Sequence, residues 1–350
     1  MTDTLAEQHI HVVGDLLGQR VQSATRIGGG RNSRVYRVRS ESGDVAAKFY
    51  FRPTADGRDR LSIEYSALNF LWKQNIRCIP EPLIADPARQ VAVYSFVDGS
   101  AIDASAVSCD DVDRLVGFAR QLKQVAAGPE SQTIGLAAEA CCSVSGVVNS
   151  ISERYRRLIA LGTSGPSYDA LRLFLREEFE PALANIDELA RRQGSTYDTE
   201  LSEERRTLSP SDFGFHNALR SAKGGLIFLD FEYFGWDDPA KMLADVLLHP
   251  RMCLTGGLRI YMAQLFRAVF GQEREWCQRV ATLYPLFGLK WCLILLNEFH
   301  PEQLERRRFV DQQHEDSHSI QMRQLNVARG LLASVMREHA RFPFWESYVG

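Results

Sequence analysis

A change in sequence character near Gly99 is the strongest constraint on the fold of this chain. Between Val21 and Val97 there are short runs in which apolar and polar residues alternate, a pattern typical of half-buried β-strands. Two of these runs, SRVYRVRS and VAAKFY, are separated by ESGD, which predicts a hairpin turn. Beyond Gly99 the apolar residues recur with a helical period. We therefore predict an α+β protein with two lobes: a small antiparallel β-sheet lobe that contains one helix, and a larger, mainly helical lobe.

The predicted boundaries follow this change. We expect a first lobe over residues 1–94, with its helix in RLSIEYSALNFLWKQN, a hinge at residues 95–99, and a helical lobe over residues 100–350. Ser167 is expected to cap the third helix of the second lobe, and Pro181 is expected to kink or split that helix. The helices of this lobe are predicted near residues 110–127, 143–161, 167–193, 239–248, 257–270, 273–296 and 315–339.

The composition excludes several classes of protein. A net charge of −3 in 350 residues provides no basic field for nucleic acid. The seven cysteines form no CxxC pair, which favours reduced thiols in a cytoplasmic protein over a disulfide framework or a zinc site. The N-terminus carries acidic residues where a signal peptide would be basic, and the apolar stretch LYPLFGLKWCLILL is short and interrupted by proline and lysine. We therefore expect this stretch to be a buried helix, with no membrane partner.

The segment LSPSDFGFHNAL contains a literal Asp-Phe-Gly, the metal-binding signature of protein kinases. That assignment requires Asp-x-x-x-x-Asn shortly upstream, but Asp198 is followed five residues later by Glu203. A different assignment fits the required order: Asp212 and Asn217 are five residues apart, and Asp230 follows across a predicted hairpin. Asp212 would then accept and orient an attacking hydroxyl, while Asn217 and Asp230 would hold Mg²⁺ against phosphate. The alternative is that Asp212 and Asn217 only form a turn.

The first lobe offers residues for a nucleotide. IGGGRNSRVYRV places Gly28, Gly29 and Gly30 where backbone N–H groups can approach phosphate, although a plain hairpin turn would have the same composition. Lys48 lies in a strand between apolar residues, and Glu64 on the following helix is its expected ion-pair partner. The alternatives are an edge lysine whose head group reaches solvent, and a glutamate on a solvated helix face.

Taken together, these residues, VYSFVDG and LDFEYFGWDDPAKMLAD resemble the aminoglycoside phosphotransferase and choline kinase family, over roughly residues 21–250. The resemblance implies a protein-kinase-like fold, ATP and Mg²⁺ as cofactors, and a small hydroxylated acceptor in place of a protein substrate. It also implies that Lys48 contacts the α- and β-phosphates, that Glu64 orients Lys48, and that backbone groups of Ser95 and Val97 hold adenine. It further implies that Asp212 is the catalytic base, with Asn217 and Asp230 as metal ligands.

The sequence departs from the family at one position. The family has His-Gly-Asp before the catalytic loop, whereas this chain has Pro210-Ser211-Asp212, and the hydroxyl of Ser209 or Ser211 could brace the loop instead. His216 is interpreted as a packing residue or a hydrogen-bond donor behind the site and not as a metal ligand. Asp238 is expected either to brace the loop or to cap the helix that starts at Pro239. For Asp237 and Glu232, the sequence leaves open whether they face the acceptor.

Two further functions compete with a small-molecule kinase. The departure at Pro210 motivates a nucleotide-binding pseudokinase. HEDSH, His314 to His318, matches the zinc-protease pattern, with Glu338 as a possible third ligand, although its polar flanks favour a solvated helix face.

Between Lys290 and Gly350 the basic and acidic residues balance, eight against eight. We therefore favour a sugar, cyclitol or amino-alcohol acceptor over a polycationic aminoglycoside antibiotic.

Overall fold

The computed structural model describes residues 4–28, 33–51, 58–192, 196–252, 254–271, 274–301, 303, 316–339 and 342–344, with backbone alone for residues 4–10. Contacts divide the chain into two compact units, each built from two segments. Unit 1 comprises residues 1–139 and 208–236, and unit 2 comprises residues 140–207 and 237–350. None of the boundaries between the two units falls at residues 95–99. The hinge expected at these residues therefore stays a prediction. The mixed α+β class with an antiparallel N-terminal sheet is confirmed.

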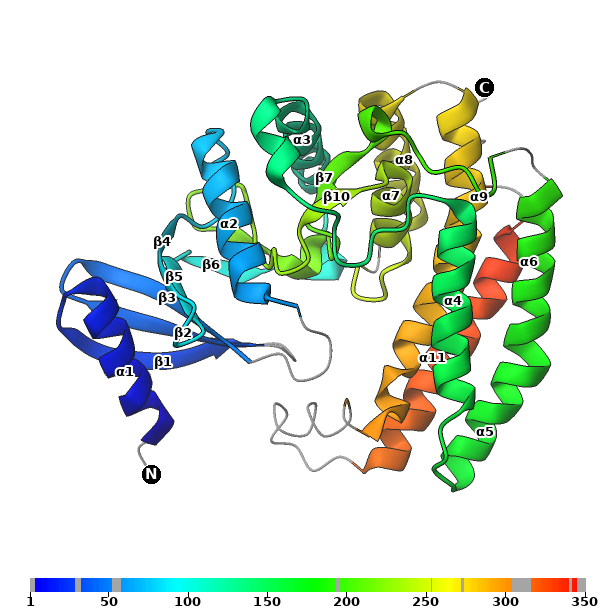
Figure 1. The fold of residues 1–350 in the computed structure, drawn as a ribbon, viewed down its shortest axis with the longest axis horizontal. Helices are drawn as coiled ribbons and strands as arrows, with labels where there is room; N and C mark the ends of the chain where they lie inside the picture. The colour runs from blue at the N-terminus through cyan, green and yellow to red at the C-terminus, as the bar shows by residue number, and fades with distance from the viewer. Residues whose placement is uncertain are drawn as a thin grey trace. The chain divides into compact units, whose positions relative to one another are not determined.

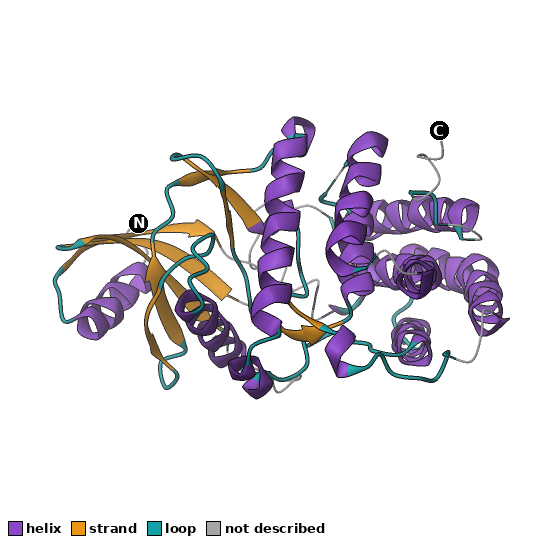
Figure 2. Ribbon diagram, turned by 90° about the horizontal axis from the view of Figure 1, so that it is seen from above, coloured by secondary structure: helices purple, strands orange, loops and turns teal. Residues whose placement is uncertain are grey.

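Unit 1 is built around a five-stranded antiparallel sheet with the strand order β1-β2-β3-β5-β4 (Figures 1 and 2). The predicted hairpin is present, with Ser40 opposite Gly43 and Val35 opposite Lys48. The first elements of the unit are α1 (Thr4–Leu17), β1 (Val21–Gly28), β2 (Ser33–Ser40), β3 (Gly43–Tyr50), α2 (Arg60–Lys73), β4 (Pro82–Asp86) and β5 (Val91–Ser95).

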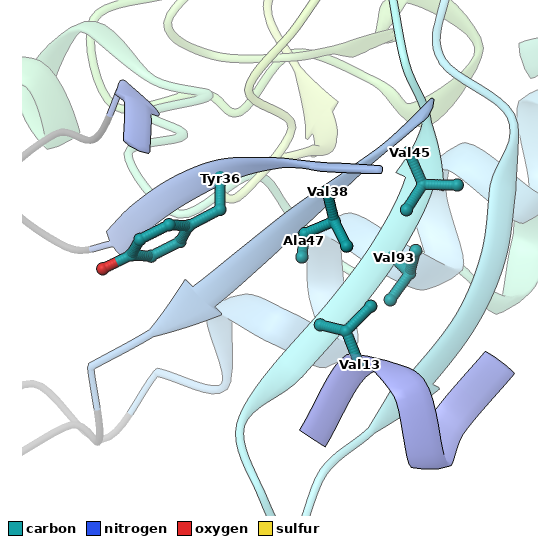
Figure 3. Close-up of a cluster of buried hydrophobic side chains, with 6 residues drawn as sticks. All are labelled: Val13, Tyr36, Val38, Val45, Ala47 and Val93. Carbon is teal, nitrogen blue, oxygen red and sulfur yellow. The ribbon is translucent and has the colours of Figure 1, made fainter. Parts of the chain in front are cut away.

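The two faces of this sheet have different roles, because successive side chains of a strand point to opposite faces. One face is apolar: Val38, Ala47 and Val93 pack with Val13 of α1 (Figure 3). The opposite face carries Lys48 of β3, whose ammonium contacts Glu64 of α2. The alternation of apolar and polar residues in β3 therefore separates the core of the unit from its polar site.

A second, three-stranded sheet of unit 1 brings distant parts of the sequence together. It pairs β6 (Gly99–Ala101) with β8 (Ala218–Ser221), and β8 with β9 (Leu226–Phe228). A Cβ atom at Gly99 would lie 2.6 Å from the carbonyl oxygen of Arg220, so only glycine allows this close pairing. Helix α3 (Cys109–Ala126) packs on this sheet through Phe118, whose ring stacks on Phe228 with 4.5 Å between centroids.

Unit 2 is mainly helical (Figure 1). Helix α9 contacts α4, α6, α7 and α11, so it forms the centre of the unit. The helices are α4 (Val144–Ile159), α5 (Pro166–Phe174), α6 (Glu180–Arg192), α7 (Pro239–Leu248), α8 (Gly256–Phe270), α9 (Arg274–Leu295) and α11 (Ser317–Glu338).

The helix predicted over residues 167–193 is interrupted as expected. A π-helical turn, Leu175–Phe179, separates α5 from α6 just before Pro181, which has no N–H to donate to the preceding turn. The predicted cap at Ser167 is wrong. Gly165 is the N-cap of α5 and Pro166 occupies the first turn, where proline is favoured. The Ser167 hydroxyl instead donates to Gln321 Oε1 at 2.7 Å.

Helix α9 contains the apolar stretch that was expected to be a buried helix. With the turn that follows it, it is long and apolar enough to cross a membrane by length and composition. The most apolar part of this helix is 67% buried inside the protein, and Pro285 and Lys290 are themselves buried. A core helix can have the same length and apolar composition as a membrane-spanning helix, and burial of this kind is typical of a core helix.

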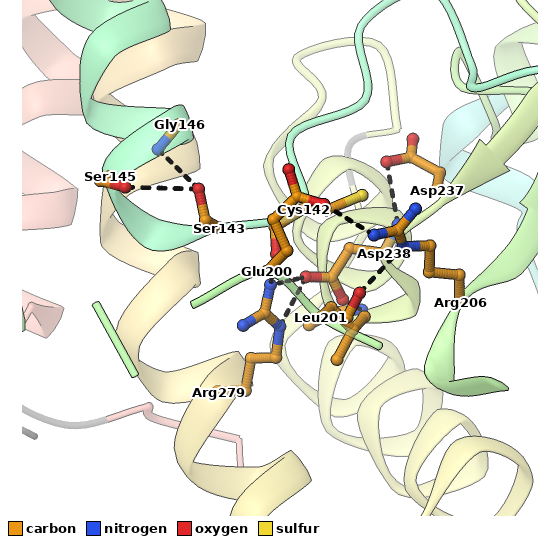
Figure 4. Close-up of polar contacts among 11 residues, drawn as sticks. Cys142, Ser143, Ser145, Gly146, Glu200, Leu201, Arg206, Asp237, Asp238 and Arg279 are labelled. Carbon is orange, nitrogen blue, oxygen red and sulfur yellow. Dashed lines mark hydrogen bonds and ion pairs between the residues drawn. The ribbon is translucent and has the colours of Figure 1, made fainter. Parts of the chain in front are cut away.

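Buried charges hold the start of α7 in unit 2 (Figure 4). Asp238 accepts a hydrogen bond from Ala240 N at 2.8 Å, which confirms the predicted cap, and it also accepts a charged hydrogen bond from Arg279 at 2.6 Å. Lys241 lies between Asp237 at 2.8 Å and Asp245 at 3.0 Å. The Asp237 side chain is fully buried, so it serves this ion network and is not presented to solvent.

Candidate active site

Lys48 connects the carboxylates of Glu64 and Asp230, which are 166 residues apart in the sequence (230 − 64). Its ammonium lies 2.6 Å from Glu64 Oε2 and 2.8 Å from Asp230 Oδ1. The Lys48 and Glu64 side chains are 10% and 5% exposed, whereas that of Asp230 is 39% exposed. Burial lowers the pKa of Lys48, but the charges of Asp230 and Glu64 outweigh it and hold the pKa well above the ordinary value. The predicted Lys48–Glu64 ion pair is therefore present.

Two tyrosine hydroxyls extend this cluster along the same face of the sheet. Tyr50, two residues after Lys48 on β3, donates to Glu64 Oε2 at 2.8 Å. Its oxygen also lies 2.9 Å from the hydroxyl of Tyr94 on β5. Burial, followed by the negative charge of Glu64, raises the pKa of both tyrosines well above the ordinary value. Both phenols therefore stay protonated, and because the single hydroxyl hydrogen of Tyr50 is donated to Glu64, Tyr94 is the donor of the bond between the two tyrosines.

The loop that carries Asp212 is held by hydrogen bonds at both ends. At its start, Ser211 N donates to Ser209 Oγ at 3.0 Å, so the Ser209 hydroxyl braces the loop as one of the two serines was expected to do. Ser211 has φ of +68°, a left-handed conformation that is uncommon outside glycine. At its end, Asn217 Nδ2 donates to the Asp212 carbonyl oxygen at 2.9 Å. The amide oxygen of Asn217, Oδ1, takes no part in this bond.

His216 contacts the Asp212 carboxylate directly. Its Nε2 lies 2.9 Å from Asp212 Oδ1. The imidazole is 2% exposed, whereas the Asp212 side chain is 38% exposed. The structure thus places a buried histidine next to a carboxylate that solvent can reach.

Asp230 is placed next to Asn217 by the backbone. Leu229 N donates to the Asn217 carbonyl oxygen at 2.8 Å. Asp230 itself has φ of +66°, and backbone strain of this kind accumulates at functional sites. One carboxylate oxygen each from Asp230, Glu232 and Glu64 lies within 4.8 Å of the others, so these groups could hold a metal ion. Asn217 Oδ1 and carboxylates are hard oxygen donors, and this donor set fits Mg²⁺.

The other residues that the resemblance assigned to a nucleotide are less fully defined. Gly28 ends β1, where an added Cβ would meet no atom within 4 Å, and Gly29 and Gly30 lie outside the described residues. The N–H of Ser95 donates to the Glu81 carbonyl at 2.8 Å and is not available to adenine. Val97 is half-buried in the segment between β5 and β6.

The zinc-protease pattern can be judged from α11. His314 lies outside the described residues, and His318 is exposed in the first turn of the helix. Glu338 lies at the other end of the same continuous helix, roughly 30 Å away at 1.5 Å per residue. It accepts a hydrogen bond from the Tyr284 hydroxyl at 3.1 Å. His318 and Glu338 therefore do not bind one metal ion together.

Comparison with known proteins identifies the family. The sequence profile of the phosphotransferase enzyme family matches residues 23–277. The chain belongs to this phosphotransferase family. The resemblance stated from the sequence is thereby confirmed, as is the expectation that the chain is a phosphotransferase. No curated protein sequence matches the chain significantly.

Solved structures of phosphotransferases share the fold. Spectinomycin phosphotransferase APH(9)-Ia, in complex with ADP and spectinomycin, aligns with a TM-score of 0.61 at 13% identity, over 91% of this chain and 98% of that one. The choline kinase LicA from Streptococcus pneumoniae gives 0.58 at 16%, over 94% and 98%. The macrolide 2'-phosphotransferase MphH from Brachybacterium faecium gives 0.56 at 17%, over 89% and 100%. The predicted kinase-like fold of this phosphotransferase is confirmed.

Two features of the site were not found by reading the sequence. The hydroxyls of Tyr50 and Tyr94 were missed, although Tyr50 is two residues after Lys48 and therefore shares its face of the strand. The closeness of a Glu232 carboxylate oxygen to Asp230 and Glu64 was not predicted, since the sequence left open only whether Glu232 faces the acceptor. Alternation along a strand was the signal that could have revealed the two tyrosines.

Proposed function

We propose that this phosphotransferase is an ATP-dependent kinase that transfers the γ-phosphate to a hydroxyl of a small molecule. The observation that carries the proposal is the convergence of Lys48, Glu64 and Asp230 in unit 1. In this assignment Lys48 binds the α- and β-phosphates and Glu64 orients Lys48. Gly28, Gly29 and Gly30 lie near the phosphates, and Ser95 and Val97 lie along adenine. The Ser95 contact would be made by its carbonyl group, since its N–H is already bonded.

The chemistry of the transfer follows from the Asp212 loop. Asp212 accepts and orients the acceptor hydroxyl, because its carboxylate is reachable from solvent and is held from behind by His216. Asn217 Oδ1 and Asp230 would hold Mg²⁺, with Glu232 as a further oxygen donor. When bound, the metal would neutralise charge on the phosphates.

For the acceptor we propose a sugar, a cyclitol or an amino alcohol, none of which is a polycation, in preference to an aminoglycoside. The eight basic and eight acidic residues between Lys290 and Gly350 give no acidic surplus.

The test begins with nucleotide binding. ATP with Mg²⁺ should raise the melting temperature, because a ligand selective for the folded state stabilises that state. The protein would then be incubated with ATP, Mg²⁺ and pooled sugars, sugar phosphates, cyclitols, amino alcohols and aminoglycosides, while ADP release and new phosphorylated masses are followed. Turnover of one compound that is lost in Asp212→Asn supports the proposal. Turnover of aminoglycosides alone would contradict the proposed acceptor class.

A nucleotide-binding pseudokinase is the second function, and the departure at Pro210 from the family pattern is the observation that favours it. The two functions give different results in the same experiment. A pseudokinase would show the ATP-dependent rise in melting temperature without turnover of any compound. A protein that shows no such rise with or without Mg²⁺ would contradict both functions.

A further inference from the structure

We propose that Tyr50 and Tyr94 are positioning residues for the ion pair that binds the nucleotide phosphates. Tyr50 holds the Glu64 carboxylate in one orientation, and Glu64 in turn fixes the Lys48 ammonium. Tyr94 acts one step further away, because it supports Tyr50. This inference rests on the proposed function, in which Lys48 binds the α- and β-phosphates of ATP.

The strands place both phenols on the face of the sheet that carries Lys48. Tyr50 follows Lys48 by two residues on β3, so the two side chains point to the same face. On β5, Ala92 lies opposite Lys48, and Tyr94 follows Ala92 by two residues. Tyr94 therefore points to this face as well. The small side chain of Ala92 leaves room for the two rings, whose hydroxyl oxygens lie 2.9 Å apart.

The hydrogen bonds between these groups run in one direction. Tyr50 has one hydroxyl hydrogen, which it donates to Glu64 Oε2 at 2.8 Å, so Tyr94 is the donor to Tyr50. The Lys48 ammonium donates to the same Oε2 atom at 2.6 Å. A carboxylate oxygen has two lone pairs, and here both accept from donors on β3. Rotation of the Glu64 carboxylate would break both bonds, so each donor helps to keep the other in place.

The orientation of Glu64 decides where the Lys48 ammonium lies. This ammonium has three N–H donors, of which one is directed to Glu64 Oε2 and one to Asp230 Oδ1. The Glu64 side chain is 5% exposed and that of Asp230 is 39% exposed, so Glu64 is the buried end of the cluster. A Glu64 carboxylate that turned away would let the ammonium shift toward Asp230. The N–H that a phosphate oxygen would accept would then be displaced.

Burial keeps water from replacing the phenols. Tyr50 and Tyr94 are each 5% exposed, and Glu64 is buried beside them. A phenylalanine at position 50 keeps the ring but leaves the buried carboxylate with one donor fewer, and hydrogen bonds to charged groups are the stronger ones. We expect nucleotide binding to weaken roughly tenfold in Tyr50→Phe and about threefold in Tyr94→Phe. The two losses should not add, because Tyr94 acts through Tyr50.

The experiment compares Tyr50→Phe, Tyr94→Phe and the double variant with Tyr65→Phe as the matched control. Tyr65 follows Glu64 on α2 and its ring centroid lies 6.3 Å from that of Tyr94, but its hydroxyl makes no hydrogen bond within the described part of the chain. Isothermal titration calorimetry gives the dissociation constant for ADP with Mg²⁺. The double variant should match Tyr50→Phe, and Tyr65→Phe should change binding by at most about twofold.

A second readout follows Lys48 in the protein without nucleotide. The sequence contains six lysines, so isotope labelling of lysine alone gives few side-chain signals in nuclear magnetic resonance spectra, and Lys48→Met identifies the signal of Lys48. Tyr50→Phe should shift this signal, and Tyr65→Phe should leave it in place. A purely structural role would lower the free energy of unfolding without moving the Lys48 signal of the folded protein. Tyr94→Phe carries the same test if Tyr50→Phe does not fold.

The Lys48→Met variant separates this inference from the proposed function. If Lys48→Met abolishes ADP binding while Tyr50→Phe binds ADP as the wild type does, the positioning role is refuted and the proposed function stands. An unmoved Lys48 signal in Tyr50→Phe, or an equal loss of binding in Tyr65→Phe, would also refute the role. Independent losses that multiply in the double variant would refute the support of Tyr50 by Tyr94. If Lys48→Met still binds ADP, the assignment of Lys48 to the phosphates is wrong and both proposals fail.

Discussion

Removal of Lys48 should destabilise the protein and abolish nucleotide binding, and the two effects can be separated. Lys48→Met leaves Glu64 as a carboxylate whose side chain is 5% exposed, with the Tyr50 hydroxyl as a neutral donor. Breaking a buried ion pair by removing one partner costs about 3–5 kcal/mol. Asp230 adds little to this cost, because its side chain is 39% exposed and water can replace the lost ammonium.

The double variant Lys48→Met/Glu64→Met tests this account. Replacing both members of a buried pair by apolar side chains of similar volume is often neutral, so most of the lost stability should return. Binding of ATP should not return, because the phosphates still lack their lysine. Urea unfolding followed by far-UV circular dichroism gives the free energies, and the ATP-induced rise in melting temperature reports binding.

Two outcomes would contradict the reasoning. A double variant as unstable as Lys48→Met would show that an unpaired Glu64 does not cause the loss. A Lys48→Met variant that still responds to ATP with Mg²⁺ would remove Lys48 from the nucleotide site. Recovery of stability without recovery of binding is the expected combination, and a general misfolding of the variants would not produce it.

Three further predictions concern the scaffold. Lys241→Met should lower the free energy of unfolding by about 3–5 kcal/mol at neutral pH, because Asp237 loses its buried partner. Burial already raises the pKa of Asp237, so protonation of this carboxylate can relieve the unpaired charge as the pH falls. The loss of stability measured by urea unfolding should therefore be smaller at pH 5 than at pH 7. Phe118→Ala should cost about 3–5 kcal/mol in urea unfolding, because its buried ring packs on Phe228. Gly235→Ala should lower the melting temperature markedly, since its Cβ would lie 2.4 Å from Ala137 N; an unchanged melting temperature would contradict the close approach.

The parts of the fold with a strong local pattern could be predicted from the sequence. Alternation in SRVYRVRS and VAAKFY gave the hairpin, and helical periodicity located most helices of unit 2. The order of Asp212, Asn217 and Asp230 pointed to one loop and one strand end, which the structure joins through the bond from Leu229 N to the Asn217 carbonyl. These features depend on neighbours in the sequence, so periodicity and spacing reveal them.

The features that were missed depend on tertiary contacts. Helix α1 was not predicted, and its position is fixed by packing of Val13 on strands far along the chain. Ser167 is a good cap in isolation, but Pro166 starts the helix one residue earlier and Gln321 of α11 takes the Ser167 hydroxyl. The two compact units are each discontinuous in sequence, and no local pattern shows that residues 208–236 return to unit 1.

This discontinuity has a consequence for synthesis of the protein on the ribosome. Residues 1–139 emerge first, with β6 exposed because its partner β8 has not yet been made, and with Phe118 lacking the ring of Phe228. Lys48 and Glu64 can pair at that stage, but Asp230 arrives only after residues 140–207 have been added. Unit 1 of the nascent chain therefore cannot be completed until about two thirds of the polypeptide has left the exit tunnel. A fragment designed to fold as this unit should join residue 139 to residue 208 and end at Trp236, where Ala137 N already donates to the Trp236 carbonyl at 2.9 Å.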